Sequence, residues 1–553
     1  MGKSISCLLV TYAGMPYTSS CFFLDNGLAN LAGSLLRNGH DVKILDYNTP
    51  AVVDFVVARD PSIGDALKKL NVQYKSNDDL VTVQKEHARL QLAIDSMLKH
   101  YYNVIYDDIK KEIINQKLDM ICFKLWLGRG VNTIISIVSE LKKEFPHIKY
   151  TAGGPAASLF YKYIDNLDVF DAVGIGEGEM SISELAEYVA GERPLESIGG
   201  IVYFKNGTSV YNPPTHEISL DEMVYPEYSQ EVYPSAHDKK NKIRVVTLDE
   251  SRGCRNKCAF CTHSLLGGTK VKVMSIEKLR NVIDYSRNIL NTSAFNLGGS
   301  CVPGTLLEEL GRANLEDGRK ILYNCFSNVK DLVGCDFKTI HDGGLFSVFL
   351  GIESYHPNVL KNGFNKYLDL DQGKYVINTA LREGIYVTCS FIYPGPFETE
   401  ETRKFTQDMI ISTLKNQKKG AAVVFYPGLM PGSRWSQNLE KYGIEAPNIE
   451  QHFCELVSCE IRHYLPTSYW DVYDYKIGGI SQREAAIMSD VFAQELDENG
   501  VNVNIMGDTA LLAHFLGQKS ELVGENLKNI FQGMDYKGMY SFVEEVNHSI
   551  ISV

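Results

Sequence analysis

The chain lacks long apolar runs. None approaches the roughly 20 residues that a helix needs to span a bilayer, so we expect no membrane span. The apolar run near its start is also too short for a signal peptide. Cysteine is scarce, with 12 mostly scattered residues in 553, which argues against a disulfide framework. These absences predict a protein of the reducing cytoplasm.

Blocks rich in Lys or Arg are missing as well. The net charge is −13, which disfavours a groove for nucleic acid. Hydrophobic residues, in contrast, make up 44% of the chain, which is ample for packed cores. A length of 553 residues exceeds one ordinary domain, so we expect about two to four domains.

A short cysteine-rich stretch is the most informative part of the chain. It places Cys254, Cys258 and Cys261 at C-x3-C-x2-C spacing, ahead of a glycine-rich turn. Thiolates are soft ligands that suit iron–sulfur clusters and zinc. A [4Fe–4S] cluster normally takes four cysteines, so three close cysteines would leave one iron open for a substrate or cofactor. A Cys3His zinc site that includes His263 is the alternative.

Residues 1–215 alternate between expected strands and helices. This pattern predicts an α/β domain with a doubly wound, Rossmann-like parallel sheet. Residues from about 51 to 115 look helical and highly charged, and we interpret them as an insertion. Ligands of such sheets bind at the carboxyl ends of the strands. The loops expected to matter are 11–21, 124–130, 153–158 and 174–179.

The remainder of the chain divides into three expected parts. The polar residues 216–243 predict a linker. Between 244 and 440, strands that end in glycine pairs recur with helices between them, which predicts a partial (β/α) TIM-type barrel. Residues 441–553 predict a small, mainly helical C-terminal domain that shapes the substrate pocket. We interpret Cys454 and Cys459 in this region as packing residues.

The run Cys254-Arg-Asn-Lys-Cys258-Ala-Phe-Cys261 and the strand-end glycines behind it resemble the radical S-adenosylmethionine (SAM) enzymes. The resemblance implies a [4Fe–4S] cluster on the three cysteines, whose open iron binds SAM and whose electron cleaves SAM to a 5′-deoxyadenosyl radical. These cysteines are therefore the expected catalytic and metal-binding residues. The residues expected to bind SAM are Phe260 near the adenine, Gly298, Gly299 and Ser300 near the amino group, and Glu353 and Ser354 near the ribose.

The glycine runs at 153–154 and 176–178 resemble the cobalamin-binding domain that precedes the barrel in one large subfamily. The resemblance implies cobalamin between the two domains. No Asp-x-His-x-x-Gly follows the first strand and His40 falls at the amino end of the second, so we expect no protein histidine on cobalt. The expected cobalamin-binding residues are Tyr12, Lys124, Leu125, Trp126, Gly153, Gly154, Gly176, Glu177 and Gly178.

Together the resemblances imply a cobalamin-dependent radical SAM methyltransferase. Such an enzyme moves a methyl group from methylcobalamin to an unactivated centre, after the 5′-deoxyadenosyl radical has removed a hydrogen atom. Its implied partners are a small-molecule or peptide substrate and an external one-electron reductant of the flavodoxin or ferredoxin type. One alternative is a cyclisation, ring contraction or rearrangement on the same scaffold. A remote alternative is a non-catalytic protein that binds zinc and a corrinoid.

Overall fold

The computed structural model describes residues 3–75, 80–215, 217–458 and 475–550 of the chain. They divide into two compact units, one built mainly on Met1–Arg244 and the other mainly on Val245–His452. Later residues join both units, since Leu527–Asn547 belongs to the first and Val472–Asn526 to the second. The region in which we predict a separate C-terminal domain is thus shared between the two units. Cys454, which we interpret as a packing residue from the sequence, is exposed instead, so that prediction is wrong. Cys459 lies outside the described residues.

The first unit contains a seven-stranded sheet with the order β2-β1-β3-β4-β5-β6-β7. Its first five strands are parallel, and β6 and β7 add an antiparallel edge. The interior strand β1 is buried nearly throughout, as expected when helices cover both faces of a parallel sheet. The strands are β1 Ser6–Thr11, β2 Asp41–Asp46, β3 Met120–Lys124, β4 Lys149–Gly153, β5 Ala172–Gly174, β6 Ile201–Lys205 and β7 Thr208–Asn212.

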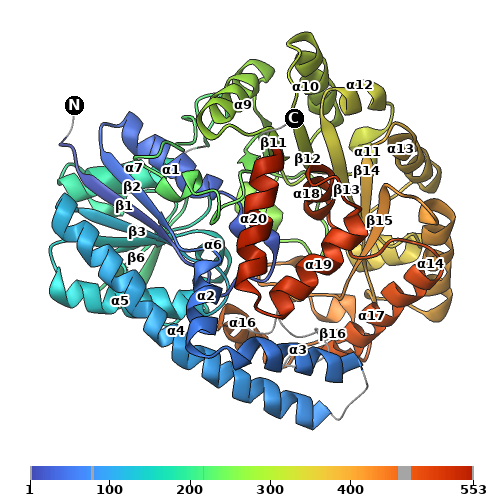
Figure 1. Ribbon diagram of the computed structural model, residues 1–553, viewed down its shortest axis with the longest axis horizontal. Coiled ribbons are helices and arrows are strands. Elements are labelled where there is room, and N and C mark those ends of the chain that lie inside the picture. The colour runs from blue at the N-terminus through green and yellow to red at the C-terminus, as the bar shows by residue number, and fades with distance from the viewer. Residues whose placement is uncertain (1–2, 76–79, 216, 459–474, 551–553) are drawn as a thin grey trace. The chain divides into compact units, whose positions relative to one another are not determined.

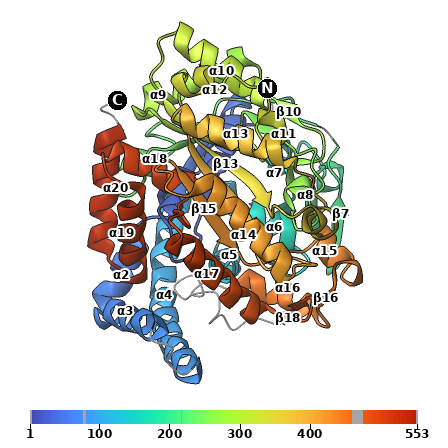
Figure 2. The same ribbon diagram turned by 90° about the vertical axis from the view of Figure 1, so that its right-hand side faces the viewer.

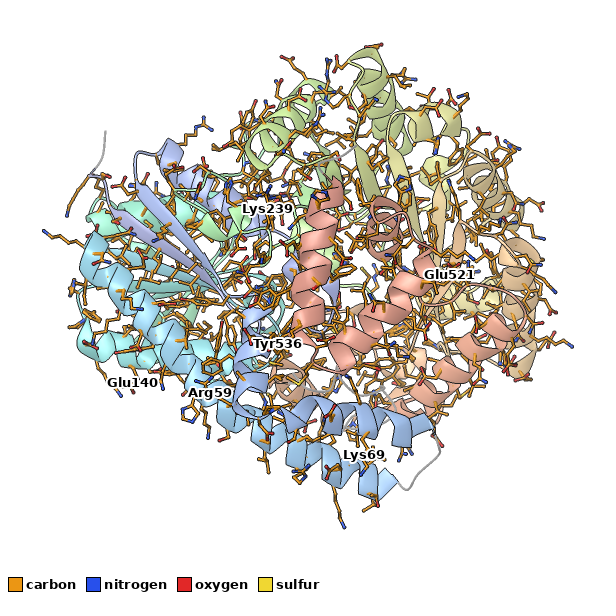
Figure 3. All side chains as sticks on the ribbon, viewed as in Figure 1. Arg59, Lys69, Glu140, Lys239, Glu521 and Tyr536 are labelled. Carbon is orange, nitrogen blue, oxygen red and sulfur yellow. The ribbon has the colours of Figure 1, made fainter. Side chains whose placement is uncertain are left out.

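Helices lie on both faces of this sheet, with α1 and α7 on one side and α4 and α5 on the other (Figure 1). Asp25 begins α1 by accepting a hydrogen bond from the backbone N–H of Leu28. The predicted helical insertion is present as α2, α3 and the long α4. Arg59 of α2, Lys69 of α3 and Glu140 of α5 carry exposed charges on these outer helices (Figure 3). The helices are α1 Asn26–Arg37, α2 Ala51–Arg59, α3 Ser62–Lys75, α4 Leu80–Gln116, α5 Gly130–Glu144, α6 Pro155–Phe160 and α7 Glu179–Ala190.

The second unit contains a six-stranded parallel sheet with the order β15-β14-β13-β12-β11-β8, the arrangement of a partial (β/α) barrel. Helices α9, α10, α13 and α14 surround its strands (Figures 1 and 2). Strand β12 was not among the strands predicted from the sequence. The strands are β8 Val246–Leu248, β11 Ala294–Leu297, β12 Leu322–Ser327, β13 Leu345–Glu353, β14 Tyr386–Ile392 and β15 Gly420–Phe425.

Short elements and further helices complete this unit and the C-terminal region. A small hairpin of β9 and β10 frames the cysteine-rich loop. The elements are β9 Ser251–Arg252, α8 His263–Gly267, β10 Lys272–Val273, α9 Ile276–Leu290, α10 Gly304–Glu316, α11 Val329–Leu332, α12 Phe337–Asp342, α13 Leu370–Arg382, α14 Glu400–Leu414, α15 Arg434–Gln437, β16 Ile444–Glu445, α16 Ile449–Ser458, β17 Lys476–Ile477, β18 Ile480–Ser481, α17 Gln482–Glu498, α18 Gly507–Phe515, α19 Ser520–Gln532 and α20 Tyr536–Ile550.

A C-terminal segment packs against the barrel strands near their amino ends. Val503 forms a bridge with Ala422 of β15, and the Thr388 hydroxyl of β14 donates to the carbonyl of Ile505. Asn324 of β12 donates to the Asp508 carboxyl at 3.3 Å. Because this segment lies near the amino ends, the carboxyl ends of the strands are left to the functional loops.

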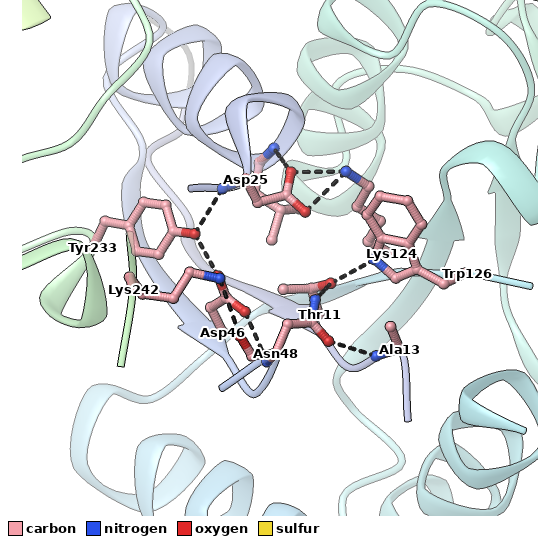
Figure 4. Close-up of polar contacts among 10 residues, drawn as sticks. Thr11, Ala13, Asp25, Asp46, Asn48, Lys124, Trp126, Tyr233 and Lys242 are labelled. Atoms are coloured by element: carbon pink, nitrogen blue, oxygen red, sulfur yellow. Dashed lines mark hydrogen bonds and ion pairs between the residues drawn. The ribbon is translucent and has the colours of Figure 1, made fainter. Parts of the chain in front are cut away.

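Residues 217–243 pack into the first unit, although their polar composition predicts a linker. Tyr228 and Tyr233 are fully buried. The Lys242 ammonium lies 2.7 Å from the Asp46 carboxylate at the end of β2, and both side chains are at most 1% exposed. The Tyr233 hydroxyl donates to the same Asp46 oxygen at 2.5 Å (Figure 4). Buried aromatic rings and one ion pair therefore fix this segment to the sheet.

No helix in the described ranges is long and apolar enough to cross a membrane.

Replacing Lys242 by Met should destabilise the first unit by about 3 kcal/mol, because it leaves the Asp46 carboxylate buried without its cation. Chemical denaturation followed by circular dichroism measures this change. Lys239→Met is the matched control, since Lys239 is exposed and the same substitution there should change stability by less than about 0.5 kcal/mol. Equal stability of the two variants would contradict this role of the ion pair.

Candidate active site

The loops predicted to carry the chemistry follow the carboxyl ends of barrel strands. The cysteine-rich loop follows β8, the Gly298–Ser300 turn follows β11, and Glu353 is the last residue of β13. In a barrel of parallel strands these ends share one face, where active sites of such barrels form. The structure therefore brings together residues that are up to about 100 positions apart in the sequence.

Backbone contacts hold the cysteine-rich loop at both of its ends. The Cys254 N–H donates to the carbonyl of Gly268, and the Ala259 N–H donates to the carbonyl of Phe364. Trp435 then donates its backbone N–H to Ala259. Near the end of the loop, the His263 N–H donates to the Cys261 sulfur at 3.4 Å. All three motif cysteines are half-buried, so they are neither fully exposed to water nor fully enclosed in the core.

The three thiols differ in their acidity. A hydrogen bond with Cys301 lowers the pKa of Cys254 to about 6. Burial raises the pKa of Cys258 to about 11 and also raises that of Cys261. Since metals bind thiolates, binding to this loop would release protons. Three soft donors on one loop fit an iron–sulfur cluster, whereas no three His, Cys, Asp or Glu side chains of the described residues are grouped as a site for one metal ion.

Glu353 forms a buried ion pair at the end of β13. Its carboxylate lies 2.9 Å from the Lys366 ammonium, and the Ser390 hydroxyl donates to its other oxygen at 3.1 Å. Lys366 also donates to the carbonyl of Gly351 at 2.7 Å. Burial opposes the charge on Lys366, but Glu353 and then Cys258 outweigh it and raise the pKa of the ammonium. A charged Lys366 thus lies within the electrostatic reach of the cysteine-rich loop.

The backbone of Glu353 is itself unusual, because it has φ of +67°. A non-glycine residue rarely adopts this region, and such strain is concentrated at functional sites. The ion pair with Lys366 and the hydrogen bond from Ser390 fix the Glu353 side chain, and so help to hold the backbone at this φ. Lys366 was not predicted as a site residue, and nothing in the sequence indicates its pairing with Glu353.

Glu250 holds the Gly298–Ser300 turn and was not predicted as a site residue. The Gly299 N–H donates to both Glu250 carboxyl oxygens, at 3.1 and 3.3 Å. A Cβ on Gly299 would lie 2.2 Å from that carboxyl and 2.0 Å from the Ser251 hydroxyl, so only glycine fits there. Burial raises the pKa of Glu250 to about 8. The Ser300 hydroxyl lies 3.4 Å from His263, on the cysteine-rich loop side.

Two predicted SAM-binding residues have partners inside the protein. The Phe260 ring packs against Phe364 and Trp435, with ring centres 5.8 and 5.9 Å apart. Ser354 is buried, and its hydroxyl bonds that of Thr406 at 3.1 Å and accepts the His356 N–H. These contacts give Phe260 and Ser354 a role in positioning the loops, and any contact with SAM stays a prediction.

Cys301 is a further cysteine beside the predicted cluster ligands. It follows the Gly298–Ser300 turn and hydrogen-bonds Cys254. Asn328 donates to its sulfur at 2.7 Å, and the thiol donates to Asp331 at 3.2 Å. Asp331 also pairs with Arg255 of the cysteine-rich loop at 3.2 Å. The sequence reasoning passed over Cys301 because it stands 40 positions beyond the motif.

In the first unit, the relevant edge lies where strand order changes direction. In the order β2-β1-β3, the next two strands of the chain, β2 and β3, lie on opposite sides of β1. Ligands of doubly wound sheets bind at such a switch point. Thr11, Asp46 and Lys124 are the last residues of three neighbouring strands, and register aligns Thr11 with both of the others. Figure 4 shows the polar network that these three residues form with the loops around them.

Lys124 is held by an ion pair within this network. Its ammonium lies 2.7 and 2.8 Å from the two Asp25 oxygens and 4.3 Å from the centre of the Trp126 ring. Trp126 donates its indole N–H to the Thr11 hydroxyl at 2.9 Å (Figure 4). Asn48 donates to the same hydroxyl and accepts the Ala13 N–H. The loops after β1, β2 and β3 are therefore fixed to one another at the switch point.

The predicted glycines form the turns next to this network. Gly154 has φ of +98°, and a Cβ there would lie 3.0 Å from the Lys124 side chain, so glycine is required. The Leu125 N–H donates to the carbonyl of Gly153 at 2.8 Å. Gly176 has φ of +86° and donates its N–H to the Ser158 hydroxyl.

Three further predicted positions surround the same edge. Gly178 precedes α7 and packs close to Leu31, and Glu177 is half-buried in the same turn. Tyr12 is buried, with its ring 5.9 Å from that of Tyr101. His40 lies at the amino end of β2, where its ring accepts the Ile5 N–H, on the edge opposite the switch point.

Comparisons with known proteins agree with this geometry, although no protein-family model matches the chain. It is 25% identical over 393 residues to an uncharacterized methyltransferase of Pyrococcus horikoshii, covering 70% of this chain and 73% of that protein. It is also 25% identical over 303 residues to hopanoid C-3 methylase of Methylococcus capsulatus, covering 53% of this chain and 56% of that enzyme.

The fold is matched over nearly its whole length by a solved structure. The radical SAM methyltransferase TsrM from Kitasatospora setae, solved with cobalamin and a [4Fe–4S] cluster bound, superposes with a TM-score of 0.63 at 13% identity. The match covers 98% of this chain and 99% of TsrM. The predicted fold class is therefore confirmed, and the chain is similar to TsrM in fold and to proteins named methyltransferase or methylase in sequence.

Proposed function

We propose that the protein is a cobalamin-dependent radical SAM methyltransferase that acts on an unactivated centre of a small molecule or peptide. The observation that carries the proposal is the meeting of the Cys254–Cys261 loop, the Gly298–Ser300 turn and Glu353 at one face of a partial barrel. The likeness to proteins named methyltransferases supports the reaction class. We further propose a reducing compartment, the cytoplasm, because half-exposed thiols stay reduced there.

Each group of residues at this face of the barrel has its own proposed role. Cys254, Cys258 and Cys261 would hold the [4Fe–4S] cluster, and Gly298, Gly299 and Ser300 would face the SAM amino group. Glu353 would bind the ribose, with Lys366 and Ser390 fixing its carboxylate. When bound, the cluster, SAM and cobalamin supply radical formation and methyl transfer, while the protein binds, orients and excludes water.

The carboxyl edge of the first unit is the proposed cobalamin site. Trp126 is half-buried and offers apolar surface there, next to the turns at 153–154 and 176–178, whereas Tyr12 and Leu125 are buried and would shape the site from behind. Lys124 would act through its charge, held in place by Asp25 and Trp126. Since the loop after β1 contains no histidine, the protein would leave cobalt without an imidazole ligand.

The reaction class is tested by product analysis with SAM, cobalamin, a reductant and candidate substrates under anaerobic conditions. Methyl transfer adds one carbon to the product and should form 5′-deoxyadenosine and S-adenosylhomocysteine in equal amounts. A product of unchanged carbon count would instead support a cyclisation, ring contraction or rearrangement.

Replacing Cys254, Cys258 and Cys261 together by Ala should abolish both the iron–sulfide content and SAM cleavage, because all three proposed ligands are removed. Iron and sulfide analysis of anaerobically prepared protein measures the first. Cys454→Ala is the control, since Cys454 is exposed and is not one of the proposed ligands. A triple variant with a full cluster, or a parent protein that holds only zinc, would show the cluster assignment to be wrong.

Glu353→Gln should weaken SAM cleavage at least about tenfold while cluster content falls little, because the amide removes the charge that pairs with Lys366 but keeps the shape. Deoxyadenosine formation and iron content are measured on the same preparation. Parallel loss of both would mean that Glu353 serves the fold and not SAM.

Paramagnetic resonance of the cobalt(II) form should show no nitrogen superhyperfine splitting from an axial imidazole. The physical reason is the position of His40 at the opposite edge of the sheet and the absence of histidine from the loop after β1. Free cobalamin with its own base bound provides the reference spectrum. An imidazole splitting, or a protein that cannot be loaded with cobalamin, would refute the proposed binding mode.

A further inference from the structure

Two phenylalanine side chains of the barrel strands are exposed. Phe326 of β12 is 45% exposed and Phe425, the last residue of β15, is 43% exposed, whereas most other large apolar residues of these strands are buried. The interior of such a barrel is normally filled by packed side chains. Exposed aromatic surface on its strands therefore indicates a place where a ligand binds.

Strand register shows which face of the sheet carries Phe326. Side chains alternate along a strand, so Phe349 and Gly351 of β13 point to the same face, and Phe326 pairs with Phe349 on that face. A Cβ on Gly351 would lie 2.7 Å from the Glu353 carboxylate and 3.1 Å from the Lys366 ammonium, so this ion pair covers the same face. Phe326 and Phe349 therefore lie on the face of the sheet that carries the proposed ribose-binding residue.

The rings of Phe326 and Phe349 form one aromatic surface, which we call the ring pair. Their centres are 5.1 Å apart and their planes are inclined by 54°. Two residues span about 7 Å along a strand, which is the step from Phe349 to Gly351. The ring pair thus lies one layer nearer the amino ends of the strands than the Glu353 carboxylate, in a position to contact a ligand bound beside SAM.

The layer on the other side of the ring pair is occupied by the protein itself. The Ser347 hydroxyl donates to the Asn324 amide oxygen at 2.8 Å, and the Asn324 amide donates to Asn296 and to Asp508, both at 3.3 Å. A Cβ on Gly507, the first residue of α18, would lie 2.4 Å from the Ser347 hydroxyl. Helix α18 therefore closes the barrel at this layer, and the exposed ring pair lies directly above it.

Charge is scarce around the ring pair. Glu353 is the one charged residue in the six strands of the sheet, all of which are described, and its carboxylate is paired with Lys366. A charged group placed on the rings would lose its water without gaining an opposite charge from the strands. Ligand pockets lined by aromatic side chains bind mainly apolar groups. The ring pair therefore fits an uncharged apolar group.

We propose that Phe326 and Phe349 bind an uncharged hydrocarbon group of the substrate, and that this group carries the carbon to be methylated. The inference rests on the proposed function and names the substrate class for it: a cyclic or linear hydrocarbon group on a small molecule or peptide. Such a carbon has neither an acidic proton nor a lone pair with which to attack SAM, so its methylation requires the radical chemistry that the cofactors supply.

The polar groups next to the ring pair favour a hydrocarbon over the adenine of SAM. Adenine needs hydrogen-bond partners for its ring nitrogens and its amino group. The Thr388 hydroxyl, which is on the residue paired with Phe349, already donates to the carbonyl of Ile505. The Asn324 amide is already bonded to its neighbours on both sides. A hydrocarbon group needs none of these partners.

The test measures binding of 2-naphthol, an uncharged aromatic probe, to the reconstituted full-length protein by titration calorimetry. The test variant is Phe326→Gln with Phe349→Gln. The matched control is Phe405→Gln with Tyr375→Gln, two exposed aromatic residues on the outer helices α14 and α13. A conservative variant, Phe326→Leu with Phe349→Leu, keeps the apolar surface and removes the rings.

The parent protein should bind 2-naphthol with a negative change in heat capacity, which marks the burial of apolar surface. The Gln variant at the ring pair should bind the probe at least about tenfold more weakly than the control variant does. The Leu variant should lose less than about threefold, because Leu retains most of the apolar contact. The affinities for SAM and for cobalamin, measured on the same preparations, should fall by much less than the affinity for 2-naphthol.

A second measurement does not depend on the folding of any variant. The photoreactive analogue 2-azidonaphthalene, activated on the parent protein, should label residues of β12 or β13, as mass spectrometry of the peptides would show. Labels confined to other parts of the chain would overturn the proposal, as would equal affinity of the Gln variant and the control for 2-naphthol.

A loss of SAM or cobalamin affinity as large as the loss of 2-naphthol affinity would assign the ring pair to that cofactor and would also overturn the proposal. Failure of the proposed function is recognised separately. A parent protein that assembles no cluster refutes that function whatever the probe does, whereas a parent with a full cluster and normal SAM cleavage that does not bind 2-naphthol refutes the substrate class alone.

Discussion

Parallel pairing of strands is the constraint on which the rest of this structure depends. It places the carboxyl ends of successive strands at one edge, so loops that are distant in sequence meet in space. In the barrel this brings the cysteine-rich loop, the Gly298–Ser300 turn and Glu353 to one face. In the first unit it aligns Thr11, Asp46 and Lys124 at the switch point. The chemistry proposed for each unit follows from that edge.

Buried charge pairs then set the shape of these edges. Glu353 with Lys366, and Lys124 with Asp25, each join a strand end to a neighbouring loop. A half-buried or buried pair is expensive to break, because the remaining charge keeps its desolvation cost. The pairs therefore hold the loops in one conformation before any cofactor binds. Glu250 does the same for Gly299 through two hydrogen bonds to the backbone.

The sequence predicted the order of elements well because the spacing of apolar residues and the glycine turns are local properties of the chain. The recurring strands and helices between 244 and 440 and the helical insertion are present as expected. Contacts between side chains that are distant in the sequence leave no such local pattern. The sequence placed Lys124 among the expected cobalamin-binding residues, but its partner Asp25 lies 99 residues away. Polar residues 217–243 looked like a linker, although Tyr228, Tyr233 and Lys242 are buried. Strand β12 was missed because polar Asn324 interrupts its apolar pattern.

The central claim is that three cysteines hold a cluster with one open iron at a barrel face built to receive SAM. Mössbauer spectroscopy of protein reconstituted with ⁵⁷Fe, with and without SAM, tests this claim most directly. A [4Fe–4S] cluster with three cysteine ligands should show one iron whose isomer shift changes when SAM is added, while the other three stay unchanged. Four equivalent irons whose isomer shifts do not change when SAM is added, or a protein that takes up no iron, would contradict the account.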